Sequence, residues 1–76
     1  MVSQGGIYIF YNNFLFLKNK SGLSLRKISE ITEIPLRTLE DISRNKTKHP
    51  SINTANELAK FFNVSLDELI NKDLTS

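Results

Sequence analysis

The residues whose types most clearly suit the binding of a ligand form a basic run in the second half of the chain. The segment RNKTKH contains Arg44, Lys46 and Lys48 and no acidic residue, whereas the stretch from Asp67 to Asp73 is acidic with only Lys72 opposing it. Closely spaced cations of this kind neutralise phosphate oxygens. The net charge is only +2, so the local distribution, more than the whole-chain balance, indicates an electropositive end that suits a nucleic acid.

The residue types that most enzymes use are scarce. The chain has no cysteine and a single histidine, His49, so it offers no thiol nucleophile and no cluster with metal-ligand spacing. It also lacks a glycine-rich phosphate loop, since Gly5 and Gly6 precede the predicted domain. The carboxylates are predicted on helix surfaces beside basic residues, where they form no recognisable acid and base pair. We therefore expect a protein that is not an enzyme and uses no cofactor or metal.

The elements that must position the basic run are predicted to be helices. The first helix begins at Ile7 and ends at Ser21–Gly22, where glycine suits the left-handed conformation of a helix end. Its buried stripe consists of Phe10, Phe14 and Leu17. The segment MVSQGG before it has no periodic pattern and is predicted to be a flexible leader, residues 1–6.

A helix, a three-residue turn and another helix are predicted between Ser24 and Arg44. Ser24 is a good N-cap for a helix whose apolar positions recur at helical spacing: Leu25, Ile28 and Ile31 or Thr32. A break follows at Glu33-Ile34. Because proline is tolerated in the first turn of a helix, the next helix is predicted to open at Pro35 and to turn Leu39 and Ile42 inward. Asn45 is predicted to cap its end.

Two more helices complete an all-α fold. Ser51 caps a helix that Asn63 ends, and its apolar face consists of Ile52, Ala55, Leu58, Ala59 and Phe62. Ser65 and Glu68 then have the form of a capping box that opens the last helix. Five helices with such short connections predict one compact orthogonal bundle, residues 7–72, followed by a tail, residues 73–76.

The apolar stretch from Ile7 to Leu17 does not indicate a membrane or secreted protein. It is too short to cross a bilayer, contains Asn12 and Asn13, and lacks a basic n-region and a cleavage site. We therefore expect a cytoplasmic protein.

The segment GLSLRKISEITEIPLRTLEDISRNKTKHPSINTANELAKFFNVSLDELI, residues 22–70, resembles the phage-repressor helix-turn-helix family, the lambda-repressor-like, Cro-like or XRE type. Its ending ELAKFFNVSLDELI is the most specific part of the likeness, together with the basic loop at the right separation before it. The resemblance implies a five-helix lambda-repressor-like domain, bacterial or phage-encoded. It also implies a sequence-specific transcriptional regulator, a repressor that binds a palindromic operator on double-stranded DNA as a homodimer.

The resemblance further implies which residues meet the DNA. The third helix would lie in the major groove, and the residues facing base edges would be Leu36, Arg37, Thr38 and Asp41. The residues meeting the phosphate backbone would be Ser24, Leu25, Arg44, Lys46, Thr47 and Lys48. The chemistry agrees, because helix N-termini present unpaired N–H groups to phosphate and Arg37 can make a bidentate contact to guanine.

Three positions depart from the family pattern. Leu25 stands where the family usually has glutamine, so a side-chain contact to phosphate is missing. Glu33 stands where the turn usually has glycine, at a cost of roughly 1 kcal/mol if the backbone there is left-handed. Glu40 and Asp41 place two acids on the third helix, where they are repelled by phosphate unless they accept from cytosine N4 or pair with arginine.

Simpler interpretations stand beside these. Arg37 can be a surface arginine paired with Glu40 or Asp41 at helical spacing, and Lys46 and Lys48 can belong to an ordinary solvated loop. His49 is expected to be a bystander before proline.

The first helix suggests a second kind of function. Beyond its stripe it carries apolar residues that a small domain cannot all bury: Tyr8, Ile9, Tyr11, Leu15 and Phe16. Such a surface predicts a protein partner, either a second subunit or a missing segment, unless the leader folds over it or the helix starts later in the chain. The alternative function is therefore a protein-interaction module of antitoxin or phage-inhibitor type on a helix-turn-helix scaffold, which Leu25, Leu36 and the acids of the third helix also favour.

Overall fold

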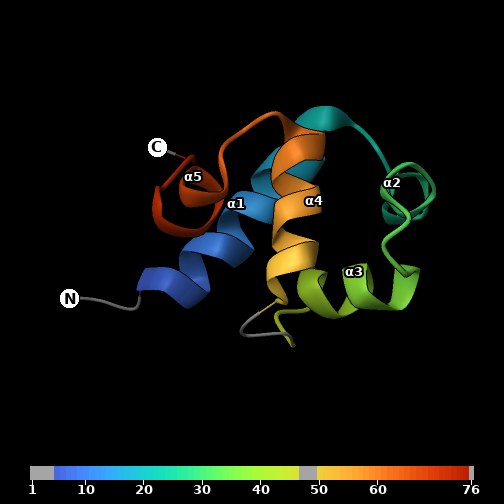
Figure 1. Ribbon diagram of the computed structural model, residues 1–76, viewed down its shortest axis with the longest axis horizontal. Coiled ribbons are helices and arrows are strands. Elements are labelled where there is room, and N and C mark those ends of the chain that lie inside the picture. Colours follow the sequence, from blue (N-terminus) through green and yellow to red (C-terminus); the bar gives the residue numbers. More distant parts are fainter. Residues whose placement is uncertain (1–4, 47–49, 76) are drawn as a thin grey trace.

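Five α-helices make up the regular structure of the computed structural model, which describes residues 5–46 and 50–75, with side chains of the first helix from Ile9 onward (Figure 1). The helices are α1 (Gly5–Ser21), α2 (Leu25–Thr32), α3 (Leu36–Ser43), α4 (Ile52–Phe62) and α5 (Leu66–Asn71). No strand occurs in the described ranges. The prediction of an all-α bundle of five helices is confirmed.

The predicted helix boundaries need small corrections at two N-termini. α1 begins at Gly5 instead of Ile7, because a glycine weakens the interior of a helix far more than its first turn, where backbone N–H groups have no helical partner anyway. α3 begins at Leu36, with Pro35 as the N-cap residue in an extended conformation. The turn between α2 and α3 comprises residues 33–35, so its length of three residues agrees with the prediction.

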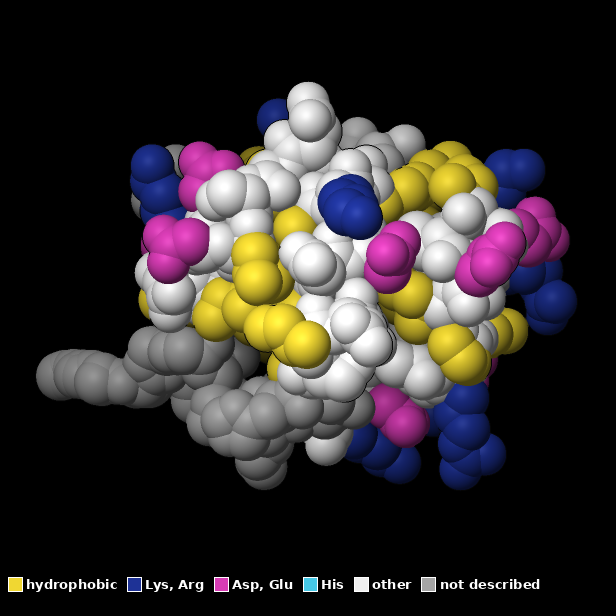
Figure 2. All heavy atoms as spheres, in the orientation of Figure 1, with side chains coloured by type: hydrophobic (Ala, Val, Ile, Leu, Met, Phe, Trp, Pro, Cys, Tyr) yellow, Lys and Arg dark blue, Asp and Glu magenta, His cyan; other side chains and the backbone are white. Residues whose placement is uncertain are grey.

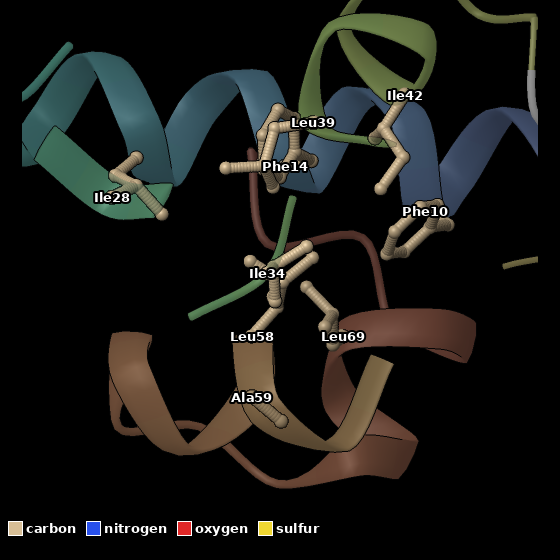
Figure 3. Packing of buried hydrophobic residues seen from close by; sticks show 9 residues of the cluster. All are labelled: Phe10, Phe14, Ile28, Ile34, Leu39, Ile42, Leu58, Ala59 and Leu69. Carbon is tan, nitrogen blue, oxygen red and sulfur yellow. The ribbon is translucent and has the colours of Figure 1, made fainter. Parts of the chain in front are cut away.

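The helices are arranged so that α2 and α3 occupy one end of the molecule and α5 the other, with α1 and α4 between them (Figure 1). The core joins both ends, and Figure 3 shows that its side chains come from all five helices and from the turn between α2 and α3. The core consists of Phe10, Phe14, Ile28, Ile34, Leu39, Ile42, Leu58, Ala59 and Leu69. Leu39 and Ile42 are the two α3 residues in this core, and their burial determines which face of α3 points outward.

One polar side chain, Asn13 of α1, is fully buried in the part of the chain that the structure describes. Its amide nitrogen donates to the carbonyl oxygens of Leu69 at 2.9 Å and Lys72 at 2.6 Å, and more weakly to that of Glu68 at 3.3 Å. Its amide oxygen accepts from the backbone N–H of Leu74 at 2.9 Å. Asn13 therefore caps the end of α5 and ties Leu74, in the predicted tail, to the bundle.

The apolar surface of α1 is less exposed than the sequence predicted. The side chains of Ile9, Tyr11, Leu15 and Phe16 are half-buried, and those of Leu15 and Leu17 pack against the core. Tyr8 lies outside the residues whose side chains are described. Large hydrophobic side chains that remain exposed in the described ranges are Ile31, 53% exposed, and Ile52, 65% exposed.

Candidate nucleic-acid interface

The helix-turn-helix is fixed by hydrogen bonds between α2 and the turn that follows it. Glu33 adopts a left-handed backbone conformation, with φ 65° and ψ 13°, and its N–H donates to the carbonyl oxygen of Ser29 at 2.8 Å. The hydroxyl of Ser29 donates to the carbonyl oxygen of Ile34 at 2.5 Å, and the hydroxyl of Thr32 accepts from the N–H of Ile34 at 3.2 Å. Both polar groups of Ile34 are thus satisfied while its side chain is buried in the core.

The outward face of α3 carries charged side chains. Leu39 and Ile42 are buried, so the helical period places Arg37, Glu40 and Asp41 on the opposite side. Arg37 is exposed, and the two acids are half-buried. In Figure 2, Lys and Arg side chains project from the lower edge of the molecule, below the position of α3 in Figure 1, with an acidic group among them.

The arginine of this face is not held by a neighbouring carboxylate. Among the described residues the only ion pair joins Lys27 and Glu30, at 3.9 Å on the exposed surface of α2. The interpretation of Arg37 as the partner of Glu40 or Asp41 therefore finds no support in the structure. No residue in the described ranges accepts a hydrogen bond from its guanidinium, whose five N–H donors can therefore serve another acceptor.

The N-terminus of α3 is open, unlike those of the helices around it. Ser24, Ser51 and Ser65 each accept the backbone N–H three residues on, so the predicted caps of α2, α4 and α5 are confirmed. The N-cap of α3 is Pro35, which makes no side-chain hydrogen bond to the helix. No side chain of the described residues thus caps the first-turn N–H groups of α3, which carry the partial positive charge of the helix.

The chain turns sharply after α3 and exposes a lysine. Asn45 has a positive φ of 58°, its N–H donates to the carbonyl oxygen of Ile42 at 3.0 Å, and the N–H of Lys46 donates to that of Asp41 at 2.8 Å. This pair of bonds is a Schellman motif, so the predicted role of Asn45 at the end of α3 is confirmed. Arg44 and Lys46 are exposed beside it. Thr47 and Lys48, also predicted to meet phosphate, lie outside the described residues.

The remaining predicted site residues divide into two kinds. Leu36 and Thr38 are half-buried on the flanks of α3. Ser24 is exposed at the start of α2, but its hydroxyl accepts from Lys27 N at 3.1 Å, and the half-buried side chain of Leu25 packs against the core. At these two positions of α2 the backbone N–H groups and the helix end, more than the side chains, are free to meet a ligand.

Sequence reasoning did not identify Ser29 and Thr32 as residues that position α3. Thr32 was considered only as a possible inward-facing residue. A sequence signal existed, because serine and threonine near a helix end commonly satisfy backbone groups of the following turn.

Within the described ranges, no group of three or more His, Cys, Asp and Glu residues could hold a metal ion, and no helix has the length and apolarity that crossing a bilayer requires.

Comparison with known proteins agrees with this geometry. The model of a helix-turn-helix family (HTH_3) matches residues 16–69, more than half of the chain and all of the segment from α2 to α4. No curated protein and no solved structure matches the chain. The matched region contains the open N-terminus of α3, its outward arginine and the tied turn before it. The chain therefore belongs to the XRE-type, lambda-repressor-like family of helix-turn-helix DNA-binding regulators.

Proposed function

We propose that this protein is a sequence-specific repressor that binds double-stranded DNA by placing α3 in the major groove. The observation that carries the proposal is the outward face of α3, which presents an exposed, unpaired Arg37 next to an uncapped helix N-terminus. The function is binding without catalysis, in keeping with a family of DNA-binding regulators. A helix of this size fits the major groove, where each base pair shows a distinct pattern of donors and acceptors.

In this proposal the first turn of α3 and the outward side chains behind it read the base edges. Arg37 donates two hydrogen bonds to guanine O6 and N7, the commonest specific contact between proteins and DNA. Leu36 and Thr38 flank it and offer methyl groups to thymine, and Thr38 adds a hydroxyl. Asp41 lies one turn further along the same face.

Phosphate contacts on both sides of α3 hold it in the groove. On one side the N-terminus of α2, at Ser24 and Leu25, offers backbone N–H groups and a partial positive charge. On the other side the cations after α3 are Arg44 and Lys46, with Thr47 and Lys48 next in the chain. These contacts carry no sequence information but supply most of the affinity, so binding weakens steeply as salt is added.

The regulator is proposed to act as a homodimer on a palindromic operator. Two identical subunits related by a two-fold axis read two half-sites about one helical turn of DNA apart. Part of the half-buried apolar surface of α1, which includes Tyr11 and Phe16, is proposed to contact the second subunit.

Selection of bound sites from a random duplex pool tests the proposal. The expected result is an enriched palindrome with a guanine at a fixed place in each half-site. Sedimentation of the purified protein with that duplex is expected to give two chains per operator. A pool that shows no enrichment at low salt, with the protein folded by circular dichroism, would contradict the proposed function.

A second candidate function is a protein-interaction module of antitoxin or phage-inhibitor type. It is favoured by an open groove of about 380 Å³ at the C-terminal ends of α1 and α4. The groove is lined by Leu17, Lys20, Ser21, Leu23, Phe61 and Phe62. The packing of Leu25 against the core removes one of the residues that favoured this alternative. Stable binding of a protein at a salt concentration where every duplex is released would support it.

A further inference from the structure

The carboxylate of Asp41 has no structural partner that explains its presence on α3. Arg37 and Arg44 are four residues before it and three residues after it, at the spacing of helical ion pairs, yet neither pairs with it. No hydrogen bond to this carboxylate occurs in the described part of the chain. Asp41 also lies in the last turn of α3, where the helix end is partly negative and aspartate is a poor helix former.

Three other acids of the domain have structural partners that account for them. Glu68 accepts from the N–H of Ser65 at 2.9 Å and completes the capping box of α5. Asp67 accepts from the side-chain amide of Asn71 at 2.8 Å, and Glu30 pairs with Lys27. Among the described residues Glu33, Glu40 and Glu57 also make no ion pair or side-chain hydrogen bond, but Asp41 differs from them as an aspartate, a poorer helix former, in the last turn of a helix, where a negative charge is unfavourable. A residue that costs stability and makes no ion pair or hydrogen bond through its side chain in the free protein points to a role in the complex.

We propose that Asp41 is a specificity-determining residue that selects a cytosine in the operator, an inference that rests on the proposed function. A carboxylate in the major groove is surrounded by phosphates and repelled by the acceptors of guanine, O6 and N7. In a G·C pair the N4 amine of cytosine has an acceptor on one side only, guanine O6, whereas in an A·T pair the N6 amine of adenine lies between two acceptors, adenine N7 and thymine O4. Cytosine is therefore the base whose edge suits an aspartate that has no arginine partner.

The helix fixes the separation between this cytosine and the guanine read by Arg37. Four residues of α-helix advance about 6 Å along the axis. Successive base pairs are about 3.4 Å apart. With α3 along the groove, the two base pairs thus lie within about two steps of each other. The inferred half-site contains two G·C pairs at this spacing, one read through its guanine and one through its cytosine.

The matched test is site selection from a random duplex pool with the wild-type chain, with Asp41→Asn and with Glu40→Gln. Asparagine has the shape of aspartate but prefers the N6 and N7 of adenine. We expect Asp41→Asn to change one position of each half-site from cytosine to adenine, with a preference of roughly tenfold in each case. Glu40→Gln removes the same charge from the same helix, and we expect it to raise affinity for all duplexes alike without changing a base.

The outcomes separate the two proposals. If the wild type enriches no sequence, or retains a protein partner while ignoring duplex DNA, the proposed function and this inference both fail. If the wild type enriches an operator and Asp41→Asn enriches the same one, the inference fails while the proposed function stands. A base change caused by Glu40→Gln instead of Asp41→Asn would overturn the assignment to Asp41. Thermal unfolding of the three chains is expected to agree within a few degrees, since both substitutions remove a charge without opening the core.

Discussion

The buried side chain of Asn13 joins the first helix to the backbone of Leu74, whose N–H donates to the Asn13 amide oxygen at 2.9 Å across 61 residues of sequence. The same side chain donates to the carbonyl oxygens of Leu69 and Lys72 at the end of α5. A single amide therefore satisfies both a donor and acceptors of a chain segment that packs on α1 and on α4. α5 is only six residues long, so its docking on α1 depends on this connection as well as on the burial of Leu69.

Replacement of Asn13 by alanine is expected to destabilise the domain by about 2–4 kcal/mol. The change leaves the carbonyl oxygens of Leu69 and Lys72 and the N–H of Leu74 without their partner, and unsatisfied groups that remain buried cost about 1–3 kcal/mol each. Urea unfolding followed by circular dichroism measures the difference. DNA affinity of the folded fraction is expected to change little, because α2 and α3 lie at the other end of the molecule.

The neighbouring Asn12 provides the control for this prediction. Asn12 is exposed on α1, so Asn12→Ala is expected to stay within about 0.5 kcal/mol of the wild type. Equal effects of the two substitutions would show that the connection between Asn13 and α5 is not what stabilises the domain.

The sequence predicted most of the helices because their ends and faces follow local rules. The caps at Ser24, Ser51 and Ser65 and the helix ends at Asn45 and Asn63 depend on residues within one turn, so they are legible in the sequence. Asn13 was taken only as a polar interruption of an apolar stretch. Its position three residues after Phe10 placed it beside the buried stripe, but the backbone of Leu69, to which it donates, lies more than 50 residues away in the sequence.

The candidate site was predicted in a similar, partial way. The helical period gives the outward face of α3 from the positions of Leu39 and Ile42. The absence of an ion pair at Arg37 among the described residues and the packing of the half-buried Leu25 against the core depend on side-chain rotamers and on packing between helices. These features have no local pattern in the sequence, which explains why only the structure revealed them.

Replacement of Glu33 by glycine is expected to stabilise the domain by up to about 1 kcal/mol. Glu33 holds a left-handed conformation that costs a residue with a Cβ atom about 1–2 kcal/mol, although the freer unfolded chain of glycine offsets part of the gain. Thermal unfolding measures the shift. The opposite exchange at a comparable site, Gly22→Ala at φ 73°, is expected to lower stability through backbone strain alone, because a Cβ atom there meets no neighbour within 4 Å. A loss of stability in Glu33→Gly would contradict this account.

Replacement of Ser29 by alanine is expected to weaken DNA binding more than its cost in stability suggests. The hydroxyl holds the carbonyl oxygen of Ile34 at 2.5 Å, in the turn that sets the angle between α2 and α3. Its loss costs about 1 kcal/mol of stability and leaves the turn freer, so α3 must be ordered on binding. Fluorescence anisotropy at a temperature where the variant is fully folded measures the affinity.

The control for Ser29 is a serine with a similar bond and no position in the turn. The hydroxyl of Ser43 donates to the carbonyl oxygen of Glu40 at 2.9 Å within α3, so Ser43→Ala removes a local bond of the same type. If Ser43→Ala and Ser29→Ala reduce affinity equally, the turn bond has no special role in positioning α3.

The Arg37→Ala and Lys46→Ala variants are expected to lose DNA affinity in different ways. Arg37 is the exposed bidentate donor of the outward face, so Arg37→Ala should cost about 1–3 kcal/mol on the operator and relax the preference for guanine at one position. Lys46 lies after the Schellman turn as an exposed point charge, so Lys46→Ala should weaken all duplexes alike and reduce the slope of log affinity against log salt by about one. Titrations of operator and scrambled duplexes at several salt concentrations measure both quantities.

Because the two substitutions each remove one positive charge, a purely electrostatic role for Arg37 predicts identical salt slopes and identical specificity for the two variants. That result would remove the base-reading role of α3 while leaving a non-specific DNA-binding function in place.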